Sequence, residues 1–200
     1  MSFNQLYQNN KNVWGDKPSK LVSIIFSNLR PSSSYLDLGC GQGKDALFMA
    51  KNNFQVTAID SSLTAIDQLK KMVKENELNN LLATQADIRN FVIEENKYDV
   101  IHAGNVLQFL GKTEAKDIID AIKKNIFHEG FVLLSSFTTD DPSYENKKED
   151  RTYFKPQEML DYFKDFKIIY YFENKILDQG HPGSLEPHKH GIVEIIAQKI

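Results

Sequence analysis

Three glycines at alternate positions form the segment whose residue types and spacing point most directly to chemistry. Gly39, Gly41 and Gly43 lie in the stretch 36-LDLGCGQGKDALFMA-50, after a short apolar run and before a helical pattern. Because glycine has no side chain and adopts positive φ at low cost, this spacing predicts a tight loop whose backbone lies close to a bound molecule. We expect the small Cys40 to belong to this binding loop and not to act as a nucleophile.

The acid before the loop and the residue after it indicate which kind of cofactor the loop holds. A nicotinamide or flavin dinucleotide site requires a third glycine at the position of Lys44, with a pyrophosphate at the following helix N-terminus. Asp37 stands just ahead of the glycines, where a buried carboxylate would repel phosphates and accept a hydrogen bond from an ammonium group. S-adenosylmethionine carries an ammonium group and a sulfonium but no phosphate. The pattern therefore favours this cofactor over a dinucleotide.

Two further acids follow apolar runs at positions that suit the rest of such a cofactor. Asp60 follows the run 54–59, about 20 residues after the first glycine, and its carboxylate is expected to accept both ribose hydroxyls, with Ser61 in the same site. Asp87 and Ile88 follow the next run and are expected to contact the amino group and the face of the adenine. Ligands of parallel sheets bind outside the carboxyl ends of the strands, so these residues should share one edge. The alternative is that Asp60 and Asp87 are helix caps or turn residues.

Apolar runs that alternate with helical patterns must position these residues. Runs bounded by polar residues or glycine are typical of buried parallel strands. The expected strands of this kind are 34–38, 54–59, 81–86, 98–103 and 131–137. Helical spacing predicts one helix after Pro18 and two more that are capped by Ser62 and Thr113. This alternation indicates an α/β fold, a Rossmann-like doubly wound sheet with helices on both faces.

The last quarter of the chain changes in character. Pro156 opens a predicted helix, and the runs 166–172 and 192–198 then read as two strands with no helix between them. Strands joined in this way are expected to pair antiparallel. We expect one domain over 1–200, with a helical lid segment at 1–30 and substrate-side excursions at 138–155 and 173–191.

Composition excludes several classes of partner. The 200 residues are 41% hydrophobic, enough for a sizeable core, yet no stretch reaches the roughly 18 apolar residues of a membrane span. The formal net charge of -3, from 24 Lys and Arg against 27 Asp and Glu, provides no basic field for nucleic acid. A single cysteine excludes an intrachain disulfide and fits a reducing compartment. We therefore expect a cytoplasmic protein that acts on a small molecule, with no nucleic-acid or membrane partner.

Motifs that recur in a fixed order carry a resemblance to a known family. They are 36-LDLGCGQG-43, 59-ID-60, 86-ADI-88, 98-YDVIHAGNVLQFL-110 and 129-EGFVLLSS-136. In this order and spacing they resemble the motifs of class I S-adenosylmethionine-dependent methyltransferases, which implies a seven-stranded sheet with an antiparallel last strand. The chain also resembles, more loosely, the tellurite-resistance methyltransferase family. That similarity lies in 13-VWGDKPSKLV-22, 154-FKPQEMLDYF-163 and 188-HKHGIVEIIAQK-199.

The segment 103-AGNVLQF-109 narrows the substrate by what it lacks. The resemblance implies that an enzyme for exocyclic or amide nitrogens would carry an Asn or Asp, Pro, Pro, aromatic tetrad here, and this chain does not. We therefore expect methyl transfer to sulfur, another chalcogen, oxygen or nitrogen of a small molecule, and not to amino groups of DNA. Asn105, Gln108 and Phe109 are expected to line the cofactor and the pocket, the alternative being a capped helix start. Two rival functions stay open, a nicotinamide-dependent oxidoreductase and a cofactor-binding module without catalysis.

Residues outside the sheet are expected to meet the substrate, because loops at this edge carry function. Tyr7 and Trp14 are expected to cover the sulfonium with their ring faces, the alternative being ordinary core packing. Arg151 is expected to hold an anionic substrate, the alternative being a solvated ion-pair surface.

Three histidines near the C-terminus admit three interpretations. His188 and His190 are two residues apart, so at the start of a final strand they would share one face, where His181 could join them. Their imidazoles could bind a metal such as zinc, copper, nickel or iron, stand exposed in a linker, or hold an oxyanion or take a proton from the substrate. Similarity to the tellurite-resistance family favours the last role. We expect His188 and His190 to be catalytic, and we expect no bound metal.

Overall fold

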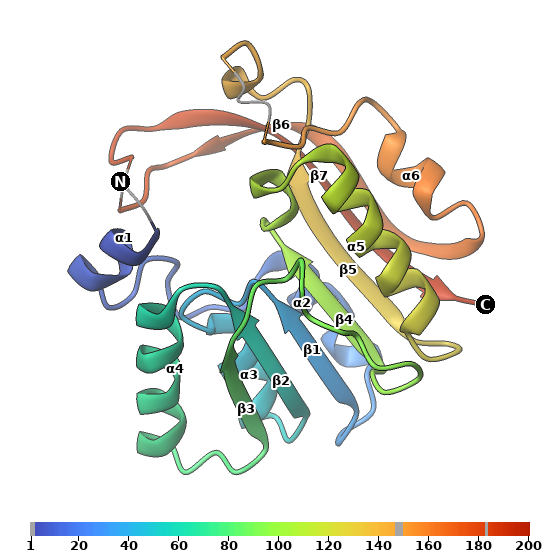
Figure 1. Ribbon diagram of the computed structural model, residues 1–200. Helices are drawn as coiled ribbons and strands as arrows, with labels where there is room; N and C mark the ends of the chain where they lie inside the picture. The colour runs from blue at the N-terminus through green and yellow to red at the C-terminus, as the bar shows by residue number, and fades with distance from the viewer. Residues whose placement is uncertain (1–2, 147–149, 183) are drawn as a thin grey trace.

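The computed structural model of the chain describes residues 3–146, 150–182 and 184–200 (Figure 1). Small parts of the three segments predicted to cover the substrate side, namely residues 1–2, 147–149 and 183, lie outside the described residues. Among the helices that the structure describes, none is both long enough and apolar enough to cross a lipid bilayer.

One mixed sheet of seven strands, in the order β3-β2-β1-β4-β5-β7-β6, forms the centre of the described chain. Neighbours among β1 to β5 are parallel, and β7 is antiparallel to both of its neighbours. The bounds are β1 (Ser34–Leu38), β2 (Gln55–Asp60), β3 (Leu81–Gln85), β4 (Val100–Gly104), β5 (Phe131–Phe137), β6 (Phe166–Asp178) and β7 (His188–Lys199). The predicted doubly wound sheet with an antiparallel last strand is thus confirmed.

The strand order reverses between β1 and β4, which is the place where such sheets bind ligands. The chain builds outward from β1 to β3 and then resumes at β4 on the other side of β1. The connections after β1 and β4 therefore leave in opposite directions and open a crevice outside the carboxyl ends of these strands. The glycine loop 39–43 follows β1, and Asn105 follows β4.

Helices cover both faces of the sheet, as predicted (Figure 1). Their bounds are α1 (Phe3–Asn9), α2 (Lys20–Ile25), α3 (Lys44–Lys51), α4 (Leu63–Glu75), α5 (Lys112–Asn125) and α6 (Glu158–Tyr162), with single 3-10 turns at Phe26–Asn28, Leu107–Phe109 and Pro142–Tyr144. Helices α2, α3 and α4 share a hydrophobic core with one face of the sheet, and α5 and α6 share a second core with the other face. Alternate strand residues supply the two cores, so that Tyr35 faces the first and Leu36 the second. Helix α1 packs against α4, outside both cores.

The predicted helix start is right at α4 and wrong at α5. Ser62 Oγ accepts a hydrogen bond of 3.2 Å from the backbone N–H of Ala65 and so caps α4. Helix α5 begins one residue before Thr113, which therefore lies inside the first turn. Its N-terminus is closed by Glu114, whose side chain accepts a 2.9 Å hydrogen bond from the backbone N–H of Gly111.

The last two strands are longer than predicted, and only residues 179–187 remain as their connection. Backbone pairing continues from Glu173 opposite Val193 to Asp178 opposite His188. Since β5 ends at Phe137, opposite Ile192, the ends of β6 and β7 project past the sheet as a two-stranded hairpin. Figure 1 shows this hairpin extending toward α1. The predicted excursion 173–191 is therefore mostly strand.

Candidate active site

Two of the three loop glycines pack against the protein itself. A Cβ on Gly39 would lie 2.5 Å from Cγ2 of Val106, in the segment after β4. A Cβ on Gly43 would lie 2.5 Å from Cδ1 of Leu69 on α4. These two positions thus let the loop close against aliphatic neighbours in the protein.

Gly41 lies beneath the two aromatic residues that were predicted to form a lid. Its φ is +55°, and a Cβ would lie 2.9 Å from the Tyr7 hydroxyl and 3.8 Å from Trp14 Nε1. Trp14 Nε1 donates a 3.3 Å hydrogen bond to that hydroxyl. Tyr7 is buried, and burial raises its pKa to about 12, whereas the Trp14 side chain is 39% exposed. The structure thus brings the predicted lid onto the one glycine of the loop with no aliphatic side chain against it.

Asp60 holds the glycine loop in shape. One carboxylate oxygen accepts a 2.8 Å hydrogen bond from the backbone N–H of Gly41, and the other accepts one of 2.8 Å from that of Ser62. Burial raises the pKa of the Asp60 carboxyl, although both hydrogen bonds oppose this shift. Each oxygen has a further lone pair for a ligand hydroxyl. The neighbouring Ser61 is exposed at the surface.

Asp37 belongs to a buried polar cluster. The residue is 3% exposed, and burial together with the nearby Asp45 raises the pKa of its carboxyl well above the usual range. His102 Nδ1 lies 3.6 Å from Asp37 and 2.8 Å from the Tyr35 hydroxyl, and burial lowers the pKa of this imidazole. Burial thus disfavours the charged form of both Asp37 and His102. Burial also raises the pKa of the Cys40 thiol well above its usual value, which agrees with a residue that is no nucleophile.

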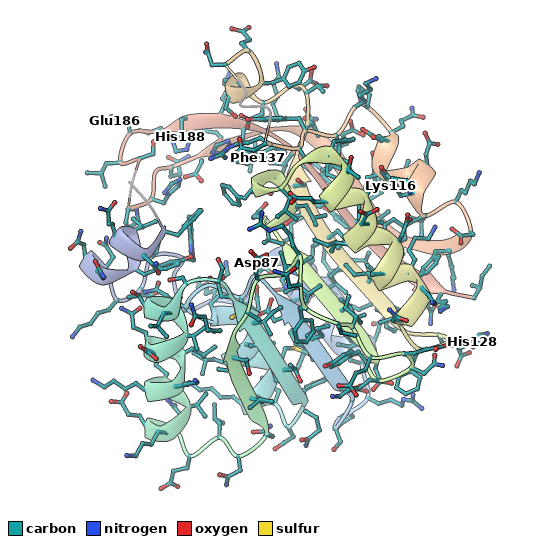
Figure 2. The ribbon with its side chains drawn as sticks, viewed as in Figure 1. Asp87, Lys116, His128, Phe137, Glu186 and His188 are labelled. Atoms are coloured by element: carbon teal, nitrogen blue, oxygen red, sulfur yellow. The ribbon has the colours of Figure 1, made fainter. Side chains whose placement is uncertain are left out.

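Asp87 is paired with its neighbour Arg89. The guanidinium donates to both carboxylate oxygens, at 2.5 Å from Nη2 and 3.0 Å from Nε, and these bonds lower the pKa of Asp87. Figure 2 shows Asp87 at the end of the sheet that faces the hairpin. Ile88 is partly buried against the core and lines a cavity of about 290 Å³ between the segment after β3 and α5.

Asn105 and Gln108 follow β4 but differ in exposure. Asn105 has a φ of +52° and is exposed, and its backbone N–H donates to the carbonyl and hydroxyl oxygens of Ser135 on β5, both at 3.0 Å. Gln108 is buried, 3.3 Å from the Ser136 hydroxyl. Of these two residues, Asn105 is therefore exposed at the end of β4 and can reach a ligand, whereas Gln108 is buried and cannot.

The N-terminal segment is fastened to the glycine loop by Gln42, which was not singled out from the sequence. Its side-chain oxygen accepts a 2.8 Å hydrogen bond from the backbone N–H of Val13, and its amide nitrogen donates to the Asn10 carbonyl at 2.8 Å. The same nitrogen donates to Gln68 of α4, which in turn donates to the Tyr7 carbonyl at 2.9 Å. Cofactor loop and lid are thus joined directly.

Aromatic ring contacts connect the predicted lid to Arg151, which was predicted to hold the substrate. Phe3 lies 5.9 Å from Tyr7 and 4.9 Å from Phe109 between ring centroids. The guanidinium carbon of Arg151 lies 4.9 Å from the Phe109 ring. Arg151 is therefore brought to the lid from the excursion 138–155.

On the other side, the lid meets the hairpin. The rings of Trp14 and His181 lie 5.2 Å apart, those of His181 and His188 5.4 Å, and those of His188 and His190 4.7 Å. His190 stacks on Phe137, the last residue of β5, at 4.8 Å. In Figure 2 the labelled His188 lies on the projecting hairpin, and Phe137 lies where β5 ends beneath it. The structure thus gathers lid and histidines at one edge of the sheet.

A family model described as tellurite resistance protein TehB matches residues 6–181. The chain belongs to the TehB family. A protein of Haemophilus influenzae named probable S-adenosyl-L-methionine-dependent methyltransferase TehB is 34% identical over 107 residues, which are 53% of this chain and 37% of that relative. A ubiquinone biosynthesis O-methyltransferase of Rickettsia akari is 30% identical over 118 residues, 54% of this chain and 42% of that relative. The crystal structure of TehB from Haemophilus influenzae superposes with a TM-score of 0.77 at 26% identity, over 90% of this chain and 61% of that protein.

This member of the TehB family spans less than two thirds of the length of these relatives. The resemblance to the tellurite-resistance family is confirmed by the family model, whose match includes the N-terminal segment 13–22 and the segment 154–163 and ends before the last strand.

Proposed function

We propose that the chain is an S-adenosylmethionine-dependent methyltransferase that acts on a small molecule. The observation that carries the proposal is the arrangement at Gly41, whose amide is held by Asp60 and whose open side is covered by Tyr7 and Trp14. A carboxylate at the end of β2 suits ribose hydroxyls, and aromatic rings suit a sulfonium cation. The names of the TehB-family relatives, which specify this cofactor, support the same assignment.

The proposed cofactor lies along the crevice between the connections after β1 and β4. Asp60 and Ser61 serve the ribose, the segment of Asp87 and Ile88 serves the adenine, and Asn105 closes the crevice from β4. Asp37 acts at the methionyl end from beneath the loop, where its ionised form would pair with the ammonium group, and burial raises the pKa of this carboxyl. Cofactor affinity should therefore rise with pH.

In methyl transfer, the main task of the protein is to hold the two reactants in the correct position. The nucleophile forms a bond to the methyl carbon while the carbon–sulfur bond breaks, and the electron pair of that bond returns to the sulfonium sulfur, which leaves as neutral S-adenosylhomocysteine. Holding the reactants in line supplies roughly 7–11 kcal/mol of the barrier. A thiolate or a chalcogen oxyanion needs no general base, whereas a neutral thiol or hydroxyl does.

We assign the substrate to the space bordered by Arg151, His188 and His190. The guanidinium would hold an anionic group, and the imidazoles would hold an oxyanion or take a proton. The acidic balance of the chain disfavours nucleic acid, so a small molecule whose acceptor atom is sulfur, another chalcogen, oxygen or nitrogen is proposed.

The test combines binding and turnover. Thermal shift should show stabilisation by S-adenosylhomocysteine and none by NAD. Release of S-adenosylhomocysteine is then followed across thiols, chalcogen oxyanions, hydroxyl compounds and amines. Stabilisation by NAD alone would refute the cofactor, and cofactor binding without turnover on any class would reduce the protein to a binding module.

A further inference from the structure

Four side chains at the tip of the projecting hairpin form a cluster of metal-ligand type. Asp178, His181, His188 and His190 each present a ligand atom, and these four atoms all lie within 4.8 Å of one another. All four side chains are partly exposed, so an ion from solution can reach them.

The topology of the hairpin brings the four residues to one side. His188 and His190 alternate along β7 and so share a face, and Asp178 on β6 is paired directly opposite His188. Gly180 turns the chain with a φ of +103°, and a Cβ there would lie 2.2 Å from the Leu185 carbonyl oxygen. This tight turn returns His181 toward the strands, so the cluster depends on a specific backbone shape.

The hydrogen bonds of the ring nitrogens show which lone pairs are free. Nδ1 of His181 lies 3.1 Å from the Pro182 carbonyl, and Nδ1 of His188 lies 2.8 Å from the Glu186 carbonyl. A carbonyl oxygen only accepts, so in both rings Nδ1 carries the proton and Nε2 keeps its lone pair. The carbonyl contacts favour the tautomer that ligates a metal through Nε2, and in His188 the Ser184 hydroxyl also lies 3.3 Å from Nδ1.

His190 has the same arrangement with a buried carboxylate. Its Nδ1 lies 2.8 Å from Oδ2 of Asp141, whose side chain is 1% exposed. The other oxygen of Asp141 accepts a 2.9 Å hydrogen bond from the backbone N–H of Ser143. Gly191 permits this approach, because a Cβ there would lie 2.4 Å from the Asp141 nitrogen. Metal-ligating histidines characteristically donate their second N–H to a carboxylate or a backbone carbonyl, and all three histidines here do so.

We propose that Asp178, His181, His188 and His190 form a binding site for a divalent first-row transition ion of the Zn²⁺ class. Three imidazole nitrogens and one carboxylate oxygen suit Zn²⁺, Co²⁺ or Ni²⁺, whereas Mg²⁺ and Ca²⁺ prefer oxygen ligands. Bonds of about 2.0–2.1 Å place tetrahedral ligands about 3.4 Å apart, so the widest pair must close by about 1.4 Å through side-chain rotation. The proposal replaces the expectation of a metal-free protein. In the ion-bound chain it also replaces the proton-accepting role of His188 and His190, because their Nε2 atoms would ligate the ion. It rests on the hairpin and not on methyl transfer.

The position of the cluster connects it to the lid. His181 contacts Trp14, which is hydrogen-bonded to Tyr7 above Gly41. An ion at this place would fix His181 to the strands and would hold the hairpin side of the substrate space in one arrangement. Metal binding and cofactor binding are nonetheless separable, because none of the four ligands belongs to the glycine loop.

The test measures metal binding directly on the full chain after treatment with a chelator. Zn²⁺ is titrated by calorimetry, and Co²⁺ is followed by its visible ligand-field absorption, which reports coordination number. We expect one ion per chain, low-coordinate Co²⁺ bands, and at least a 100-fold loss of affinity in the variant His188→Ala/His190→Ala. His128→Ala is the matched control, since His128 lies at the opposite end of the molecule (Figure 2), and it should bind like the wild type.

A second variant tests the outer partner without removing a ligand. Asp141→Asn should lower Zn²⁺ affinity about 10–100-fold, because an amide holds the His190 ring less firmly than a carboxylate. Calorimetry with S-adenosylhomocysteine on the same samples separates this proposal from the proposed function, and all variants should bind it like the wild type. Absence of stoichiometric Zn²⁺ binding by the wild type, or wild-type affinity in the double variant, overturns the metal site whatever the cofactor result.

Discussion

Replacing Asp60 by alanine should weaken the protein's affinity for S-adenosylhomocysteine and its stability together. The carboxylate accepts two backbone hydrogen bonds of 2.8 Å, from Gly41 and Ser62, and the proposed ribose adds two more. Hydrogen bonds to charged groups contribute about 1.5–3 kcal/mol each, but the raised pKa of Asp60 shows that burial offsets part of this. We therefore expect the free energy of unfolding to fall by about 2–3 kcal/mol, and Tm by about 5–10 °C.

Affinity for the cofactor product should fall at least tenfold, which corresponds to about 1.4 kcal/mol. Isothermal calorimetry at a temperature where the variant is folded measures this loss. Asp67→Ala is the matched control, because it removes the same charge from an exposed position on α4. Unchanged affinity in folded Asp60→Ala would refute the placement of the ribose, and a loss of the same size in Asp67→Ala would assign the effect to net charge.

Three further substitutions test other parts of the site. Gly41→Val should abolish binding of S-adenosylhomocysteine in calorimetry, because the new Cβ would lie 2.9 Å from the Tyr7 hydroxyl. Gly15→Val is the control and should retain binding, because Gly15 also has a positive φ, +74°, but a Cβ there would have nothing within 4 Å. Arg151→Gln should raise KM for an anionic substrate at least tenfold with cofactor affinity unchanged, and an unchanged KM would return Arg151 to the solvated surface. Burial lowers the pKa of His102 in the folded chain, so below its ordinary pKa of about 6.5 the unfolded chain binds a proton that the folded chain does not. The free energy of unfolding should therefore be unaffected by this group above pH 6.5 and should fall by at most about 1.4 kcal/mol per pH unit as the pH drops toward the lowered pKa. Urea unfolding from pH 7.5 to 5.5 should show this slope in the wild type and a smaller one in His102→Gln.

The sheet could be predicted from the sequence wherever its strands are buried. The runs at β1 and β5 are buried on both faces, and the predicted bounds agree with the structure. The ends of β6 and β7 were missed because they project past the sheet, where backbone pairing and not apolar burial holds them. Hydrophobic periodicity in a sequence indicates which residues are buried, so it cannot predict a polar hairpin that is held by backbone pairing.

The parts of the candidate site that could be predicted are those where a particular residue type occurs at a characteristic spacing. Gly41 and Asp60 were singled out by spacing alone, and the hydrogen bond from the Gly41 N–H to Asp60 brings them together. Gln42 and Asp141 were missed, because a single polar residue in a loop carries no sign of its distant partners. Their roles depend on long-range contacts that only the folded chain brings together.

The mouth of the site consists of two units that are anchored separately. Gln42 and Gln68 tie the lid to the glycine loop and α4, so the lid cannot lift without breaking hydrogen bonds next to the proposed cofactor. The hairpin is anchored instead through His190 and Asp141 to the segment after β5. The two units meet at the rings of Trp14 and His181, 5.2 Å apart, a contact with no hydrogen bond to break. We therefore expect the substrate to enter between Trp14 and His181, and an ion that orders His181 would control the width of this opening.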